Sequence, residues 1–353
     1  MENSKIYERQ ENQTTKSCFM NLINMKYMKI AYKLLFSLIL ITNCSNNLFS
    51  QNIIEEYEPK KNDSIRIGTG EKDFLPFIQK GYTLMLPKRK DIKGVLLFLE
   101  DSGYDKKNKN SKQIYNEASK NGFAVLSVSS EIPFDFYFSK NSAHSSHEII
   151  KQAFEKYNLP NKNIFFIGVA LSGHRAMKHI EFMREDNYTF QLNIKGIVIC
   201  NTKLDWSMEW YKYDREKRNK RNDLWEPTFA NYMLETNLNG TPKTNPESYY
   251  DFSTYNYFDE KKENIKFYTN YSVRAYIEPA IKYWLKRHLK TMYDNNSPDA
   301  VGLLAELELA GNQNTELIVF ESDDDKTQKK NSDSIWGRIN KKELMVWIKN
   351  HSE

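Results

Sequence analysis

Short apolar runs alternate with stretches of helical period over most of residues 82–200. The run at 94–99 is apolar throughout, which is typical of a strand buried on both faces of a parallel sheet. The pattern predicts strands at 82–86, 94–99, 122–128, 163–167 and 194–200. Between them it predicts helices at 111–121, 145–157 and 172–184. This alternation predicts an α/β protein with a doubly wound, mostly parallel sheet.

The alternation stops after residue 201. Residues 204–262 are rich in Trp, Tyr, Asn and charge, and they predict a helical cap insertion with helices at about 205–218 and 224–238. The strand and helix pattern then resumes. It predicts strands at 272–277 and 316–320, and helices at 279–293, 298–310 and 341–349, with a polar loop at 321–333.

The first 50 residues are typical of an N-terminal extension and signal peptide, which leaves 51–353 as a single domain. Basic residues at Lys29 and Lys33 precede the short apolar run at 34–41, a pattern that predicts export to the periplasm or the extracellular space. Cleavage after Ser50 is one outcome. Acylation of Cys44, giving an outer-membrane lipoprotein, is the other. Contact with the membrane is expected only through the signal peptide or this lipid anchor.

Composition narrows the function classes. The 353 residues are 40% hydrophobic and 27% charged, as in a globular protein, and the net charge of +5 is spread along the chain. We therefore expect no nucleic-acid partner. Of the three cysteines only Cys200 remains after cleavage at Ser50, so no intramolecular disulfide is expected. No Cys/His spacing suits a metal, and we expect no metal and no cofactor.

The stretch at 163–176 predicts a strand, a tight turn and a helix. That is the context of a nucleophile elbow, Gly-x-Ser-x-Gly, in which small residues flank a serine held above the sheet. Gly168 and Ser172 occupy the two flanking positions, but the residue between them is Ala170. Alanine has no hydroxyl and can form no acyl-enzyme. A register shifted by two residues makes Ser172 the nucleophile, although it places the large His174, expected to be partly exposed, at a small position.

Two later segments carry a family resemblance. Residues 274–284, Arg-Ala-Tyr-Ile-Glu-Pro-Ala-Ile-Lys-Tyr-Trp, are similar to a segment Arg-x-Tyr-x-Glu-Pro-Asp-Ile-x-Trp-Trp, and residues 309–318 contain Gly-Asn followed by Glu-Leu-Ile. On these motifs the chain resembles the secreted α/β-hydrolase-like proteins of Bacteroidetes over roughly residues 80–350. The resemblance implies α/β-hydrolase topology. It places the triad acid at Ala280 and the base at Ser334, so that with Ala170 the triad is degenerate.

The same elbow predicts where an oxyanion would bind. The donors are expected from the residue after the nucleophile position, Leu171, and from the loop that contains Gly103.

The cap supplies aromatic residues that could line a vestigial pocket for a small molecule or instead form the core of the cap: Trp206, Trp210, Tyr211 and Trp225. The sequence thus predicts a catalytically inactive α/β-hydrolase-like protein that binds a ligand or partner in the cell envelope. The alternative is an active secreted serine hydrolase, an esterase or peptidase, that uses Ser172.

Overall fold

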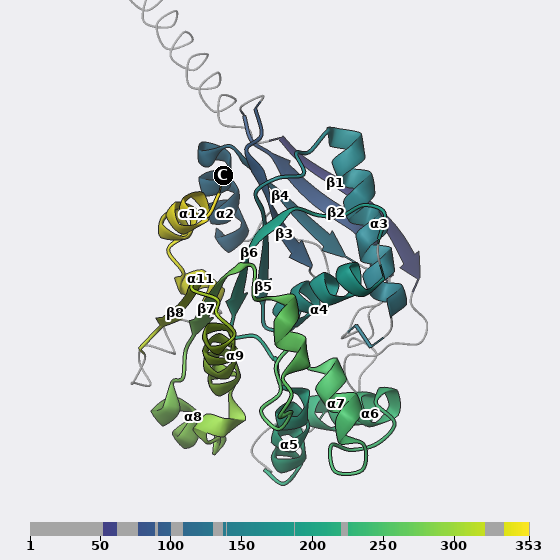
Figure 1. Cartoon of the computed structure of the whole chain (residues 1–353), viewed down its shortest axis with the longest axis vertical. Helices are drawn as coiled ribbons and strands as arrows, with labels where there is room; N and C mark the ends of the chain where they lie inside the picture. Colours follow the sequence, from purple (N-terminus) through teal and green to yellow (C-terminus); the bar gives the residue numbers. More distant parts are fainter. Residues whose placement is uncertain are drawn as a thin grey trace, which may run out of the picture. The chain divides into compact units, whose positions relative to one another are not determined.

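Eight strands form a single sheet in the order β1-β2-β4-β3-β5-β6-β7-β8 (Figure 1). The computed structural model describes residues 52–61, 77–88, 91–99, 109–129, 137–138, 140–186, 188–219, 225–321 and 335–352. Its strands are β1 (Asn52–Lys61), β2 (Phe77–Leu86), β3 (Gly94–Leu99), β4 (Phe123–Ser129), β5 (Ile164–Val169), β6 (Ile194–Cys200), β7 (Ser272–Ile277) and β8 (Thr315–Val319). Neighbours from β4 to β8 are parallel, and β2 is antiparallel to β1 and β4.

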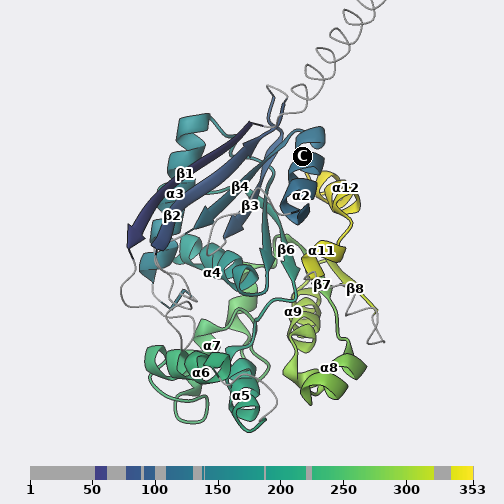
Figure 2. The ribbon, with the colours of Figure 1, turned by 180° about the vertical axis from the view of Figure 1, so that it is seen from behind.

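Helices cover both faces of this sheet (Figures 1 and 2). One face packs on α2 (Lys109–Asn121), α11 (Ile335–Arg338) and α12 (Lys341–Asn350). The other packs on α3 (Lys140–Tyr157), α4 (Leu171–Glu185) and α9 (Ser297–Leu309). Since the central strands are buried on both sides, β3 and β4 are inaccessible to solvent along their whole length. The predicted doubly wound, mostly parallel sheet is confirmed.

The strand β1 was not predicted. It carries Glu55, Glu56 and Glu58 and lies at the edge of the sheet, paired only with β2 among the described strands. An edge strand keeps solvent on one side, and charged residues are common there because they discourage further pairing. The apolar pattern that reveals a central strand is therefore missing from this one.

The predicted cap lies between β6 and β7. It contains α5 (Trp206–Lys217), α6 (Trp225–Asn237), α7 (Pro246–Phe252) and the 3-10 turn η2 (Glu263–Phe267). The helices predicted at 205–218 and 224–238 are present, whereas α7 was not predicted. These helices gather beyond one end of the sheet (Figure 1) and enclose a small core of their own.

The helix predicted at 279–293 is shorter than expected. In its place are α8 (Ile281–His288) and the 3-10 turn η3 (Met292–Asp294). The helix α8 ends at Leu289, which has a left-handed backbone with φ 53°. Two side chains of the cap donate hydrogen bonds to the carbonyls at the end of α8. Asn219 Nδ2 donates to His288 O (2.6 Å), and Arg215 donates to Leu289 O (3.2 Å). These bonds replace the helical partners that the last carbonyls of α8 lack.

Several predictions concern residues outside the described part of the chain. They are the signal peptide with Cys44, the loop residue Gly103, the predicted loop at 321–333 apart from its first residue, and the base position Ser334. Of the described helices, none combines the length and the apolar character that a membrane span requires.

Candidate functional site

The turn between β5 and α4 is built on contact between two backbones. A Cβ added to Gly168 would lie 2.2 Å from the Cα of Gly173, and one added to Gly173 would lie 2.1 Å from Thr202 Oγ1. Real Cβ atoms do not approach so closely, so both positions require glycine. The turn brings Gly168 against the backbone of Gly173 and of Ser172, so glycine is needed at 173 in addition to the small residue that the sequence pattern placed at 172.

Ala170 occupies the apex of this turn. Its backbone has φ 52° and ψ −118°, a conformation that non-glycine residues rarely adopt. The Ala170 amide donates to Cys200 O of β6 (2.9 Å), and the Ala170 carbonyl accepts from Gly173 N (3.3 Å). These bonds hold the apex in place at the carboxyl end of β5. The apex is exposed and presents only a methyl group.

Ser172, the alternative nucleophile, is turned away from the apex. The residue is buried, and its Oγ accepts from Val169 N (2.7 Å) and donates to Val169 O (2.9 Å). The hydroxyl thus accepts one hydrogen bond and donates one, both with Val169, the last residue of β5. The hydroxyl stabilises the turn in this position and would have to break both bonds to attack a substrate.

His174 was expected to be partly exposed, and this was wrong because the cap covers it. Its ring is fully buried, its Nδ1 accepts from Trp206 Nε1 (3.1 Å), and its centroid lies 5.0 Å from those of both Trp206 and Phe252. The side chain therefore connects α4 to the cap.

Ala280 lies at the carboxyl end of β7, where the resemblance placed the acid. It is buried, adopts a left-handed conformation (φ 42°, ψ 42°), and caps α8 by accepting from Trp284 N (3.1 Å). In the sheet, β6 separates the strands that lead to Ala170 and Ala280. Leu171 begins α4 and packs against the cap core.

The cap aromatics named from the sequence pack within the cap. Trp206 is inaccessible to solvent and belongs to the cap core. Trp210 donates to Glu235 Oε1 (2.8 Å) and meets Tyr211 edge-on (centroids 5.2 Å apart), while Trp225 stacks on Phe229 (5.2 Å). None of the four lines either of the two cavities described below.

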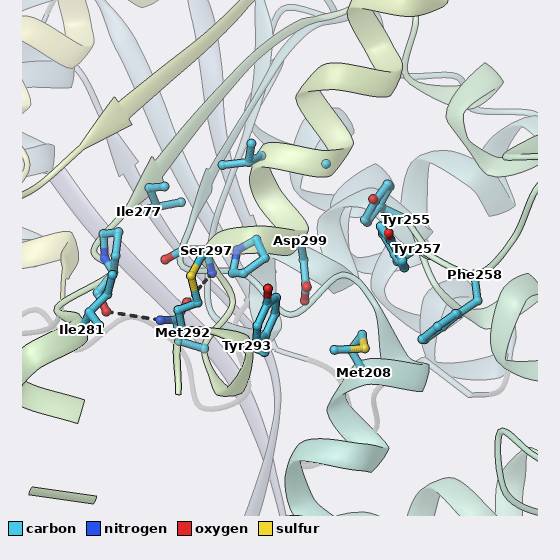
Figure 3. Close-up of a pocket in the computed structure, with 15 residues that line it drawn as sticks. Met208, Tyr255, Tyr257, Phe258, Ile277, Ile281, Met292, Tyr293, Ser297 and Asp299 are labelled. Carbon is cyan, nitrogen blue, oxygen red and sulfur yellow. Dashed lines mark hydrogen bonds between the residues drawn. The ribbon is translucent and has the colours of Figure 1, made fainter. Parts of the chain in front are cut away.

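The larger cavity has a volume of about 620 Å³ and lies between the cap, the end of β7 and the start of α9 (Figure 3). That volume is within the ~300–1,000 Å³ range of small-molecule sites. Its wall is mostly aromatic and aliphatic: Met208, Tyr255, Tyr257, Phe258, Ile277, Pro279, Ile281, Pro298, Met292, Tyr293, Val301 and Gly302. Three polar residues interrupt it: Asn295, Ser297 and Asp299. Pro279 and Ile281 flank Ala280, so the cavity adjoins the acid position.

A second cavity of about 200 Å³ shares Asn295 with the first and is lined mainly by polar residues. Among the described residues, no three His, Cys, Asp or Glu side chains come together to hold a metal ion. Cys200 is buried and forms no disulfide with another described residue.

Asp299 is the charged residue in the wall of the larger cavity, and it belongs to a buried cluster. Lys212 Nζ lies 2.7 Å from Glu209 Oε1 and 3.4 Å from Asp299 Oδ2, and Lys203 lies 3.5 Å from Glu209. Asp205 accepts from Met208 N (2.9 Å) and Tyr257 N (2.7 Å). Burial raises the pKa of Asp299 to about 7 and the pKa of Asp205 to about 6.

No sequence pattern singled out Asp299 or Ser297 as site residues. Ser-Pro-Asp at 297–299 is an ordinary helix start, with proline in the first turn and an acid that favours the helix N-terminus. Only the folded structure, in which Lys212 and the aromatic residues of the cap lie against α9, shows that the carboxyl of Asp299 lines a cavity.

Solved structures with the same chain path define the class of fold. The carboxyl esterase 2 of the mycorrhizal fungus Tuber melanosporum matches with a TM-score of 0.50 at 11% identity, covering 86% of this chain and 88% of that one. An acylaminoacyl peptidase of Pyrococcus horikoshii matches with a TM-score of 0.51 at 10% identity, covering 88% of this chain but 43% of its own. The chain therefore has an α/β-hydrolase fold with a helical cap. No protein-family profile and no curated protein sequence matches it.

The backbone at Ala170 gives a first prediction. Replacing Ala170 with glycine removes the Cβ that makes φ 52° unfavourable, so we expect Ala170→Gly to increase the free energy of unfolding by about 1 kcal/mol. The matched control is Ala305→Gly in the exposed middle of α9, which should decrease it by about 1 kcal/mol. Urea denaturation measures both. A loss of stability in Ala170→Gly would contradict the strain assigned to the apex.

The pKa of Asp299 gives a second prediction. Because burial raises this pKa from 3.8 to about 7, the folded state binds more protons than the unfolded state between these values, and Asp299 reduces stability as the pH rises through them. The free energy of unfolding of Asp299→Asn, measured relative to that of the wild type, should therefore increase by about 2 kcal/mol from pH 5 to pH 8.

The measurement is urea unfolding of both proteins at the two pH values. Glu308→Gln, which changes an exposed acid of the same helix, is the control. A stability difference between Asp299→Asn and wild type that stays constant with pH would show that Asp299 ionises as it does in the unfolded chain.

Proposed function

We propose that this protein is a non-catalytic member of the α/β-hydrolase fold class that binds a small molecule in the cavity of about 620 Å³. The observation that carries the proposal is the methyl group of Ala170 at the exposed apex of the elbow. Acyl transfer on this scaffold requires a nucleophilic side chain at that point. The remaining elbow geometry is retained, so the scaffold is intact while the reacting atom is missing.

The cavity supports a binding role. Its wall comes from the cap, from β7 and the segment after it, and from α9, so a ligand would contact both the cap and the sheet scaffold. Such a wall, apolar with a few polar groups at one place, is typical of a small-molecule site.

An active serine hydrolase that uses Ser172 is the competing function. It is disfavoured by the two hydrogen bonds between Ser172 Oγ and Val169, and by the use of the His174 ring between Trp206 and Phe252. A base that activates Ser172 would have to reach a buried hydroxyl beneath the turn.

A fluorophosphonate probe and nitrophenyl esters test this choice. We expect no covalent labelling and no ester turnover by the wild type above the level of Ser172→Ala. That variant should instead lose about 1 kcal/mol of stability, because it leaves two backbone groups of Val169 without this partner. An active esterase labelled in parallel controls for the probe. Labelling of the wild type that disappears in Ser172→Ala would establish the active hydrolase and overturn the proposal.

We also propose that the protein acts outside the cytoplasm, on the basis of the basic residues and the apolar run at 34–41. The intact mass of the mature chain purified from its natural host tests this. A chain that begins at Gln51 is expected, and a diacylated Cys44 at the N-terminus would indicate the lipoprotein form. A chain that retains residues 1–50 would contradict export by this signal.

A further inference from the structure

We propose that the ligand of the larger cavity is an organic ammonium ion, in which an apolar body carries one protonated amine that pairs with Asp299. The inference rests on the proposed binding function and specifies its ligand class. Four observations support it: the aromatic wall, the place of Asp299 in it, the charge of the buried cluster, and a second buried polar group beside Asp299.

The aromatic part of the wall comes from two segments. Tyr255, Tyr257 and Phe258 follow α7 in the cap, and Tyr293 belongs to η3; Figure 3 shows Asp299 between these two groups. The faces of tyrosine and phenylalanine rings attract cations, at about 0.5–2 kcal/mol for each good contact. Tyr257 and Tyr293 are largely exposed in the absence of ligand, with 69% and 63% of their surface accessible. A bound molecule would cover them.

Asp299 is the only charged residue among those that line the cavity within the described part of the chain. Lys212 contacts its Oδ2 at 3.4 Å, but the same ammonium lies nearer to Glu209, at 2.7 Å. No hydrogen bond to Oδ1 is present among the described residues. One oxygen of the carboxylate is therefore available for a donor from the cavity.

The buried cluster around Asp299 has an excess of acid. Among the described residues it contains the carboxyls of Asp205, Glu209 and Asp299, and the two amines of Lys203 and Lys212. With every group ionised the cluster carries one uncompensated negative charge, which is unfavourable in a buried place. An ammonium ligand at Asp299 would supply the missing cation.

Ser297 provides a second polar group on the same turn of α9. Its Oγ is buried and has no hydrogen-bond partner within the part of the chain that the structure describes, and the residue lines the cavity. A primary ammonium has three donors, so it could donate to the carboxylate and also to a hydroxyl. A carboxylate ligand would be repelled by Asp299, and a neutral apolar ligand would cover the carboxylate without pairing it.

Calorimetric titration of the mature protein at pH 8 with octylamine, octan-1-ol and octanoate tests the ligand class. The three probes share one alkyl chain and differ in charge. We expect octylamine to bind at least 10-fold more tightly than octan-1-ol, because a charged hydrogen bond contributes about 1.5–3 kcal/mol, and octanoate to bind more weakly than either.

Three variants locate the site. Asp299→Asn should weaken octylamine about 10-fold and leave octan-1-ol unchanged. Val301→Trp, on the exposed rim of the cavity, should weaken both probes, whereas Leu309→Trp, on the same helix but outside the cavity, should weaken neither. If Asp299→Asn does not fold, Tyr257→Leu takes its place. It changes an exposed ring and should weaken octylamine more than octan-1-ol.

The outcomes separate the two proposals. Binding of octan-1-ol or octanoate as tight as that of octylamine, blocked by Val301→Trp, would overturn the ammonium assignment and leave the cavity as a binding site. Octylamine binding that Asp299→Asn and Tyr257→Leu do not change would also overturn it. No binding of any probe to the wild type would overturn the proposed binding function as well.

Discussion

The contact between the backbones of β5 and α4 is the constraint on which the site depends. Gly168 and Gly173 touch without room for a side chain, and Thr202 closes the space behind them. The chain can pass from strand to helix there only through an unusual backbone conformation, and Ala170 adopts it. The position of α4 follows from this crossing, and with it the place of His174 against Trp206 of the cap. The turn therefore determines the structure at the carboxyl end of β5, and this holds for any side chain at its apex.

The conformation of this turn is maintained by hydrogen bonds that involve no reactive side chain. A backbone conformation that is unfavourable for alanine persists when the surrounding structure determines it, and here the bonds from Ala170 to Cys200 and Gly173 do so. Ser172 adds two further bonds to the end of β5. None of these interactions needs a nucleophile. The fold is shared with a carboxyl esterase and an acylaminoacyl peptidase.

The second organising feature is the buried charge cluster between the cap and α9. Asp205 fixes the start of α5 and the segment at Tyr257, and Lys212 connects Glu209 of α5 to Asp299 of α9. Buried charges are favourable only when they are well paired, so this cluster sets the position of the cap relative to the scaffold narrowly. The same cluster places Asp299 in the cavity wall. In the proposed function, the interaction that holds the cap also provides the group that selects the ligand.

The sequence by itself determined the central strands, the tight turn that follows the strand at 163–167, and the cap between β6 and β7. These features depend on local periodicity and on the space that small residues leave, both of which are visible in adjacent positions. The tertiary structure alone decided that β1 pairs at the edge, that α8 ends at Leu289, that His174 is buried, and that Asp299 lines a cavity. Each of these depends on residues distant in the chain, as Lys212 and Asp299 are by 87 positions. No local sequence pattern predicts such a contact, because the energy of the contact comes from burial and ion pairing that exist only in the folded chain.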